Sequence, residues 1–193
     1  MTRPWVVLVA GGHAAGKKTV CKDLVEAVEK LSDGGISLHS DVVHLSDYKV
    51  GKRGPKAYDF EKLKQHLDSQ EQQMIMVEGL YALYDQQLRD RAVMKVFVDA
   101  DADTRLSRWI LRDTQGDSSK LGDVLEETKD FADVILPRGS EKSGIDLIAA
   151  GIYDRIREEA PLSSDYTPMV AEKPINLRRE SVQAQNQHYY DLN

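Results

Sequence analysis

Short apolar runs alternate with stretches of helical periodicity over most of the chain. Residues 5–10, WVVLVA, form a continuous apolar run, which is typical of a strand buried on both faces. Such runs predict strands at residues 5–10, 42–46, 74–79, 95–100 and 132–137. Patterns with helical spacing lie at residues 20–31, 59–70, 82–91, 102–113 and 143–158. The alternation predicts an α/β fold in which a central parallel sheet is flanked by helices on both faces.

The apolar periodicity fades from Pro161 onward. With 193 residues, of which 41% are hydrophobic, the chain is long enough for one well-buried core. We therefore expect one domain over residues 1–160. Residues 161–193 are expected to form a C-terminal tail that is poorly ordered or docked and has no core of its own.

Charge and cysteine content narrow the class of protein. The formal net charge of -6 argues against a general binder of nucleic acid or of anionic membranes. The single cysteine, Cys21, cannot form an internal disulfide, which suits a reducing compartment. The apolar run at 5–10 is too short for a signal peptide, and no run approaches the roughly 20 apolar residues that a membrane span needs. These features predict a soluble, cytoplasmic protein.

Most of a phosphate-binding loop follows the first predicted strand. The pattern G-x-x-x-x-G-K-[ST] is matched from Gly11 to Lys17 in the stretch GGHAAGKKTV. Glycines let backbone N–H groups curl round a phosphate, and the helix that follows presents its positive end to the same anion. A glycine-rich turn without a nucleotide is the alternative. The loop predicts a nucleotide-binding site made of Gly11, Gly12, His13, Ala14, Ala15, Gly16, Lys17, Lys18 and Thr19.

The last position of this loop departs from the pattern. A Ser or Thr hydroxyl normally stands there and coordinates Mg²⁺ beside the transferred phosphate, whereas this chain has Lys18 and places its hydroxyl one residue later, at Thr19. A lysine cannot ligate a metal. Three outcomes stay open: Thr19 supplies the hydroxyl, Lys18 takes over part of the metal's electrostatic role, or transfer is weak or lost.

Two carboxylates and a set of arginines are further candidates. Glu78 closes a predicted strand at the sheet edge where ligands of α/β folds collect, so it could hold magnesium, or simply cap the junction. Asp47 also follows a strand and could accept a proton from a substrate hydroxyl, or form an ordinary Asx turn. Arg105, Arg108 and Arg112 share a helical face, which is either a solvated stripe or a lid that stabilises phosphoryl charge.

With these pieces in order, the chain resembles the uridine/cytidine kinase family of P-loop kinases over most of residues 4–158. The loop GGHAAGKKTV is similar to that family's loop except at Lys18, VEGLYALYDQQLRD looks like the segment with its metal-associated Glu, and KVFVDADADTRLSRWILRD is similar to the start of its lid. The resemblance implies a three-layer P-loop kinase fold, ATP as donor with Mg²⁺, and transfer to the 5′-hydroxyl of a uridine- or cytidine-like nucleoside. It implies catalytic roles for Asp47, as general base, and for Lys17, Arg108 and Arg112.

The departures from this family cluster on the nucleoside side. Arg53 stands where the family's ribose-binding aspartate would fall, and Trp109 replaces a lid arginine. The helix at 59–70 runs almost directly into the strand MIMVEG, so the family's base-recognising β-hairpin is expected to be missing. An impaired, regulatory nucleotide-binding protein and a kinase for another small riboside are therefore alternatives to a nucleoside kinase. The sequence leaves the acceptor and the oligomeric state open, a homo-oligomer included.

Overall fold

The computed structural model describes residues 3–32, 39–52, 54–71, 73–101, 103–105 and 128–159. The chain divides into residues 1–160 and 161–193, and the second of these units lies wholly outside the described residues. The expected C-terminal tail is therefore not described. The architecture below concerns the first unit.

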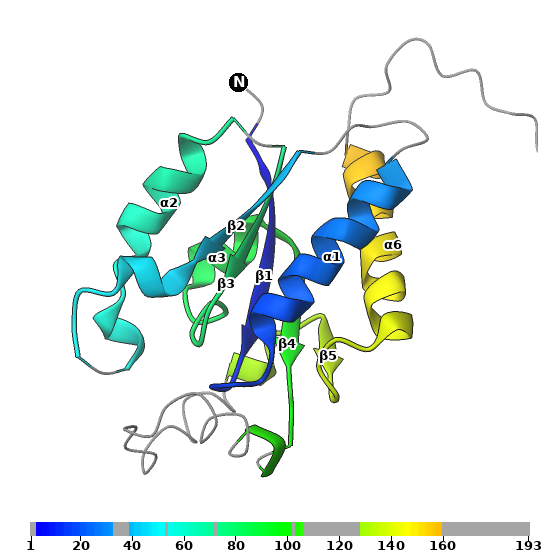
Figure 1. The fold of residues 1–193 in the computed structure, drawn as a ribbon. Helices are drawn as coiled ribbons and strands as arrows, with labels where there is room; N and C mark the ends of the chain where they lie inside the picture. Colours follow the sequence, from blue (N-terminus) through cyan, green and yellow to red (C-terminus); the bar gives the residue numbers. More distant parts are fainter. Residues whose placement is uncertain are drawn as a thin grey trace, which may run out of the picture. The chain divides into compact units, whose positions relative to one another are not determined.

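A five-stranded parallel sheet forms the centre of the described part of the chain (Figure 1). Its strands run in the spatial order β2-β3-β1-β4-β5, so β1 lies between β3 and β4. Each predicted strand is confirmed, with shifted ends. The strands are β1 (Trp5–Gly11), β2 (Ser40–His44), β3 (Met74–Glu78), β4 (Ala92–Val98) and β5 (Val134–Leu136).

Helices cover both faces of this sheet. Two of them, α1 (Lys17–Ser32) and α6 (Lys142–Glu159), pack on one face, whereas α2 (Phe60–Asp68) and α3 (Gln86–Arg91) pack on the other (Figure 1). Two 3₁₀ helices, η1 (Leu45–Tyr48) and η2 (Pro55–Ala57), join β2 to α2. The prediction of an α/β fold with three layers is thus confirmed. Among the described helices none is both long and apolar enough to cross a membrane.

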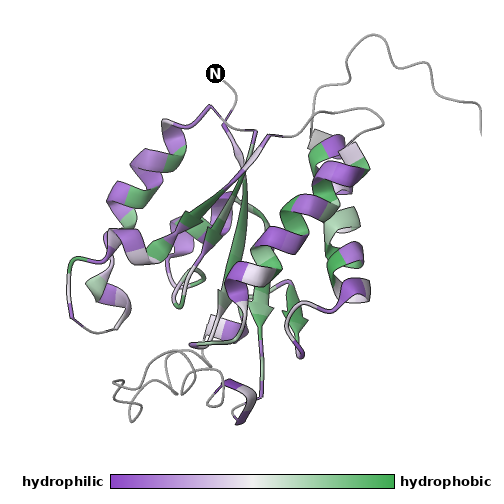
Figure 2. Cartoon of the chain, in the orientation of Figure 1, coloured by the Kyte–Doolittle hydropathy of each residue, from purple (hydrophilic) through white to green (hydrophobic). Residues whose placement is uncertain are grey.

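The core follows from the way side chains of β1 alternate between the two faces. Val7 and Val9 are fully buried in the cluster that contains α1 and α6, whereas Val6 and Leu8 are buried in the cluster with α2 and α3. Figure 2 shows hydrophobic residues along the inner strands, while α1 alternates between hydrophobic and hydrophilic positions. A strand buried on both faces must be apolar throughout, which is why its sequence is a continuous run.

Side-chain caps set where the two shorter helices begin. Asp59 accepts a hydrogen bond from the Lys62 backbone N–H at 2.9 Å at the start of α2. Asp85 accepts from the Leu88 N–H at 2.8 Å at the start of α3, so this helix begins later than the predicted 82–91. The helix predicted over residues 102–113 is helical at 103–105, and its remainder lies outside the described residues.

Adjacent residues of α6 allow a matched test of this core. Ile148 is 2% exposed and Leu147 is 74% exposed. Ile148→Ala should lower the free energy of unfolding by about 2–5 kcal/mol, because it removes buried methylenes and leaves a cavity. Leu147→Ala should change it by no more than about 0.5 kcal/mol, since the same surface is already in water. Urea unfolding of both variants measures this, and equal losses would contradict the described packing.

Candidate active site

The phosphate-binding loop spans the turn from β1 to α1. Gly11 has a φ of +149°, and a Cβ placed there would lie 2.4 Å from the Val98 carbonyl oxygen. Gly16 has a φ of +100°, in the region that favours glycine. Ala14, at a φ of +55°, adopts the left-handed conformation without being glycine, which costs on the order of 1 kcal/mol. The chain therefore accepts backbone strain to form this loop.

Positive groups converge on the loop. The Lys17 ammonium folds over it and donates to the carbonyl oxygens of Gly11, at 3.1 Å, and Gly12, at 2.8 Å. Lys17 and Lys18 begin α1, whose first turn carries no acidic residue. The helix N-terminus and the two ammonium groups therefore act on an anion in the same direction.

Arg105 brings a further positive charge from a distant segment. Its guanidinium lies against Gly12, where a Cβ would be 2.1 Å from Arg105 Nη1. Its Nε is buried and has no hydrogen-bond partner among the described residues. An unsatisfied guanidinium N–H beside a phosphate loop is suited to donate a hydrogen bond to an anionic ligand. Of the three arginines that share a predicted helical face, Arg105 is the one that the structure describes.

The pKa of His13 reflects the environment of the loop. Its side chain is exposed at the loop. Its pKa is lowered from the ordinary value of 6.5, first by the loss of solvation and then by the positive charges of Lys17, Lys49 and Arg105. These three cations, which come from separate segments, therefore act on one point of the loop.

A cavity of about 260 Å³ lies between this loop and the carboxyl ends of β2 and β3. Gly79, directly after β3, lies against Leu45, directly after β2, and a Cβ on it would be 2.4 Å from Leu45 Cβ. This close contact brings the two strand ends together beside the loop. The cavity is lined by His13, Ala14, Gly16, Lys17, Lys18, Thr19, Ser46, Tyr58, Glu78, Gly79 and Leu80.

The predicted site residues are only partly brought together. Thr19 and Glu78, the two expected metal ligands, line the same cavity as Lys17 and Lys18. Asp47 is exposed in η1 and is not among the lining residues, but its neighbour Ser46 lines the cavity and donates to Asp47 Oδ1 at 3.4 Å. Arg108 and Arg112 lie outside the described residues, as do Arg53 and Trp109.

One contact of the predicted site residue Glu78 was not predicted from the sequence. Glu78 is only 5% exposed, and His44 Nδ1 lies 2.8 Å from its Oε1. The two residues end neighbouring strands and stand opposite each other in the register of β2 and β3. The contact could have been predicted from the ends of the two strands, which meet at one edge of the sheet. The predicted strand at 42–46 ends two residues after β2 does, so the prediction placed His44 inside the strand.

The connection between α2 and β3 is short. Only residues 69–73 join α2 to β3, which is too few for a β-hairpin, as the sequence predicted. Aromatic rings lie nearby: Tyr58 contacts Phe60 and Tyr81, and Phe60 stacks on Tyr84 with ring centroids 6.2 Å apart. Of these residues Tyr58 lines the cavity.

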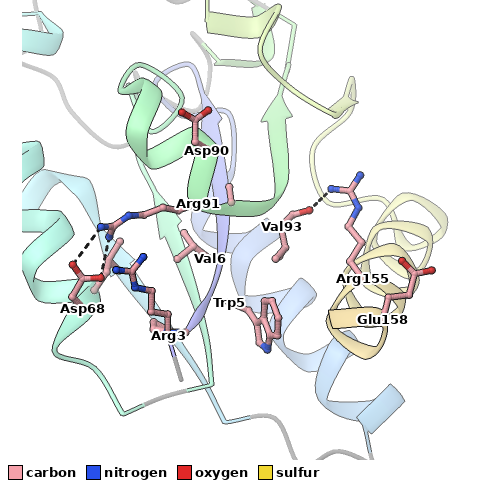
Figure 3. Close-up of a pocket in the computed structure, with 12 residues that line it drawn as sticks. Arg3, Trp5, Val6, Asp68, Asp90, Arg91, Val93, Arg155 and Glu158 are labelled. Atoms are coloured by element: carbon pink, nitrogen blue, oxygen red, sulfur yellow. Dashed lines mark hydrogen bonds and ion pairs between the residues drawn. The ribbon is translucent and has the colours of Figure 1, made fainter. Parts of the chain in front are cut away.

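A larger hollow, of about 560 Å³, lies at the opposite, amino end of the sheet (Figure 3). Two of its arginines are already engaged: Arg91 pairs with Asp68 at 3.1 Å, and Arg155 donates to the Val93 carbonyl oxygen. Ligands of open parallel sheets bind at the carboxyl ends of the strands. We therefore place the candidate site at the smaller cavity, beside the loop.

The lowered pKa of His13 predicts a pH dependence of stability. Because the unfolded chain takes up the His13 proton at a higher pH than the folded chain does, protonation favours unfolding. Relative to His13→Gln, the free energy of unfolding should be constant above pH 6.5 and should decrease as the pH falls below 6.5, until the folded chain is also protonated. Urea unfolding at a series of pH values measures this difference, and parallel curves for the two proteins would contradict it.

Known proteins are similar to this sequence over most of its length. A model of the phosphoribulokinase / uridine kinase family matches residues 43–142. A uridine kinase of Deinococcus deserti is 31% identical over 205 residues, with 80% of this chain and 98% of that protein covered. Uridine-cytidine kinase B of Dictyostelium discoideum is 28% identical, with 81% of this chain and 84% of that protein covered. A uridine kinase of Clostridium tetani is 27% identical, with 81% and 98% covered.

The first alignment is longer than the part of this chain that it covers. It runs over 205 residues, yet takes in only 80% of this 193-residue chain. The Deinococcus protein therefore has residues without a counterpart here. On the family match and the identity to this relative, the chain belongs to the phosphoribulokinase / uridine kinase family.

Proposed function

We propose that this protein is an ATP-dependent phosphotransferase that transfers the γ-phosphoryl group to the 5′-hydroxyl of a uridine- or cytidine-like nucleoside. The observation that carries the proposal is the single cavity between the phosphate loop and the ends of β2 and β3. A donor held by the loop and an acceptor held beside η1 would meet in this space. Membership of the family supports the same reaction.

On the donor side, the loop would hold the polyphosphate. Its backbone N–H groups and the N-terminus of α1 would bind the phosphate oxygens, and Lys17 would exchange its carbonyl partners for them. Arg105 would direct its unsatisfied guanidinium toward the same anion. Arg108 and Arg112, further along the chain, are proposed to add charge at the transferred group.

On the acceptor side, Asp47 would act as general base. The proton of the acceptor's hydroxyl would pass to the Asp47 carboxylate, and the hydroxyl oxygen would form a bond to the γ-phosphorus. The bond from that phosphorus to the bridging oxygen would break, and ADP would leave with the electron pair. Such a reaction asks the protein mainly for positioning and charge stabilisation.

The residues present do not fit Mg²⁺ well, although the resemblance implies it. The ion prefers an octahedron of oxygen ligands, usually one or two carboxylates with water and phosphate. Glu78 is available only with one oxygen already bound to His44, and two ammonium groups, those of Lys17 and Lys18, share its cavity. Thr19 remains as a hydroxyl beside them. The steps above therefore use groups of the chain alone.

Two other functions have specific support. The His44–Glu78 contact and Lys18 favour a regulatory protein that binds nucleotide without transferring phosphate. The short connection at 69–73 favours a kinase for another small riboside, because it leaves no room for the base-recognising β-hairpin of the family that the sequence resembles. Turnover with a panel of nucleosides separates these functions, since only a kinase makes ADP in an acceptor-dependent way.

Replacing Asp47 tests the proposed mechanism. Asp47→Asn should lower acceptor-dependent ADP production by about 10²–10⁴-fold, because a general base typically contributes that much, while ATP affinity should stay unchanged. Asp41→Asn, an exposed change at the other end of the β2 segment, is the matched control and should have no effect. Lys17→Ala should abolish turnover through loss of phosphate contacts. Full turnover in Asp47→Asn would exclude Asp47 as the base.

A further inference from the structure

We propose that protein cations replace the divalent metal ion at this site, so that the nucleotide polyphosphate binds as the metal-free anion, with Lys18 as the decisive residue. The proposal rests on the proposed nucleotide binding and deepens it. It concerns affinity for the polyphosphate and holds whether or not phosphate is then transferred.

The first support is the charge that surrounds the loop. Lys17 and Lys18 line the cavity, and the first turn of α1 contains no acidic residue. Arg105 lies against Gly12 with a buried N–H that has no partner among the described residues. Lys49 adds positive charge that is felt at the loop. A metal ion normally offsets part of the polyphosphate charge, and here side chains supply that charge.

The second support is the contact that the Glu78 carboxylate already makes with His44. Glu78 is buried, and its Oε1 lies 2.8 Å from His44 Nδ1. A divalent ion would have to compete with His44 for this group or use the other oxygen alone. It would also stand in the same cavity as Lys17 and Lys18, whose charges repel it. Both features disfavour an ion at the place where the family's loop would hold one.

The third support is the position of Lys18 itself. It is exposed in the first turn of α1 and lines the cavity beside Lys17 and Thr19. A flexible ammonium carries three donors and can follow phosphate oxygens, whereas a hydroxyl at this position would serve a metal. Thr19 can then donate its hydroxyl to a phosphate. The alternative, in which Thr19 ligates Mg²⁺ and Lys18 points away, makes the opposite prediction for binding.

Calorimetric titration of the full chain with ATP separates these alternatives. The titration is done once with EDTA and once with excess Mg²⁺, and the two dissociation constants are compared. For the unchanged chain, binding in EDTA should be as tight as binding in excess Mg²⁺, or tighter, because Mg²⁺ converts the metal-free ATP into its metal complex. Lys18→Ser should weaken binding in EDTA by about tenfold or more, because a phosphate-binding charge is lost, and Mg²⁺ should restore part of the affinity.

Lys22→Ser is the matched control. It makes the same substitution one turn further along α1, where the exposed side chain does not line the cavity, and it should bind like the unchanged chain. Lys18→Arg keeps the charge and should retain binding in EDTA. This variant keeps the test decisive if Lys18→Ser were poorly folded.

The outcomes distinguish this inference from the proposed function. ATP binding that requires Mg²⁺ would overturn the inference and leave the phosphotransferase intact. Binding in EDTA that Lys18→Ser leaves unchanged would overturn the role of Lys18. Failure to bind ATP under either condition would overturn both the inference and the proposed function.

Discussion

The whole site depends on how β1 ends between its two parallel neighbours. Pairing with β3 on one side and β4 on the other buries this strand and fixes its last residue, Gly11, opposite Val98. A side chain at Gly11 would overlap the Val98 carbonyl oxygen, so only glycine lets the chain turn there. The turn therefore opens at a switch point of the sheet, where ligands of such folds bind, and α1 starts with its N-terminus toward it.

The sequence predicted the strands correctly where the buried apolar residues themselves form the strand. Strand β1 is buried on both faces and is a continuous apolar run, and β3 is one up to Glu78, whereas the apolar sequence of β4 is interrupted by Lys95. The same reasoning failed at the end of β2, because Leu45 is fully buried although it belongs to the 3₁₀ helix η1. It also started α3 too early, since Ala82 and Leu83 are buried in a turn. Apolar residues indicate that a segment is buried, but they do not show whether it is a strand, a helix or a turn.

The candidate site also combines a part that the sequence predicts with contacts that only the folded chain shows. The loop from Gly11 to Thr19 could be predicted because its chemistry is contiguous in the sequence. The His44–Glu78 contact joins residues 34 positions apart and depends on the register of β2 against β3. The contact of Arg105 with Gly12 depends on where the chain turns after β4. No local pattern encodes either pairing, so both require the folded chain.

The electrostatic state of the free site follows from these long-range contacts. The chain has a net charge of -6, yet Lys17, Lys49 and Arg105 gather at one point, where the loss of solvation lowers the pKa of His13 and their positive charges lower it further. Such a cluster repels itself and destabilises the folded chain when no anion is present. A polyanion bound among these groups would relieve their mutual repulsion. The free energy that the repulsion costs the folded chain would then add to the affinity for the polyanion. The proposed polyphosphate would therefore find its positive partners already in place, and on the same proposal a metal ion that enters would have to overcome their charges.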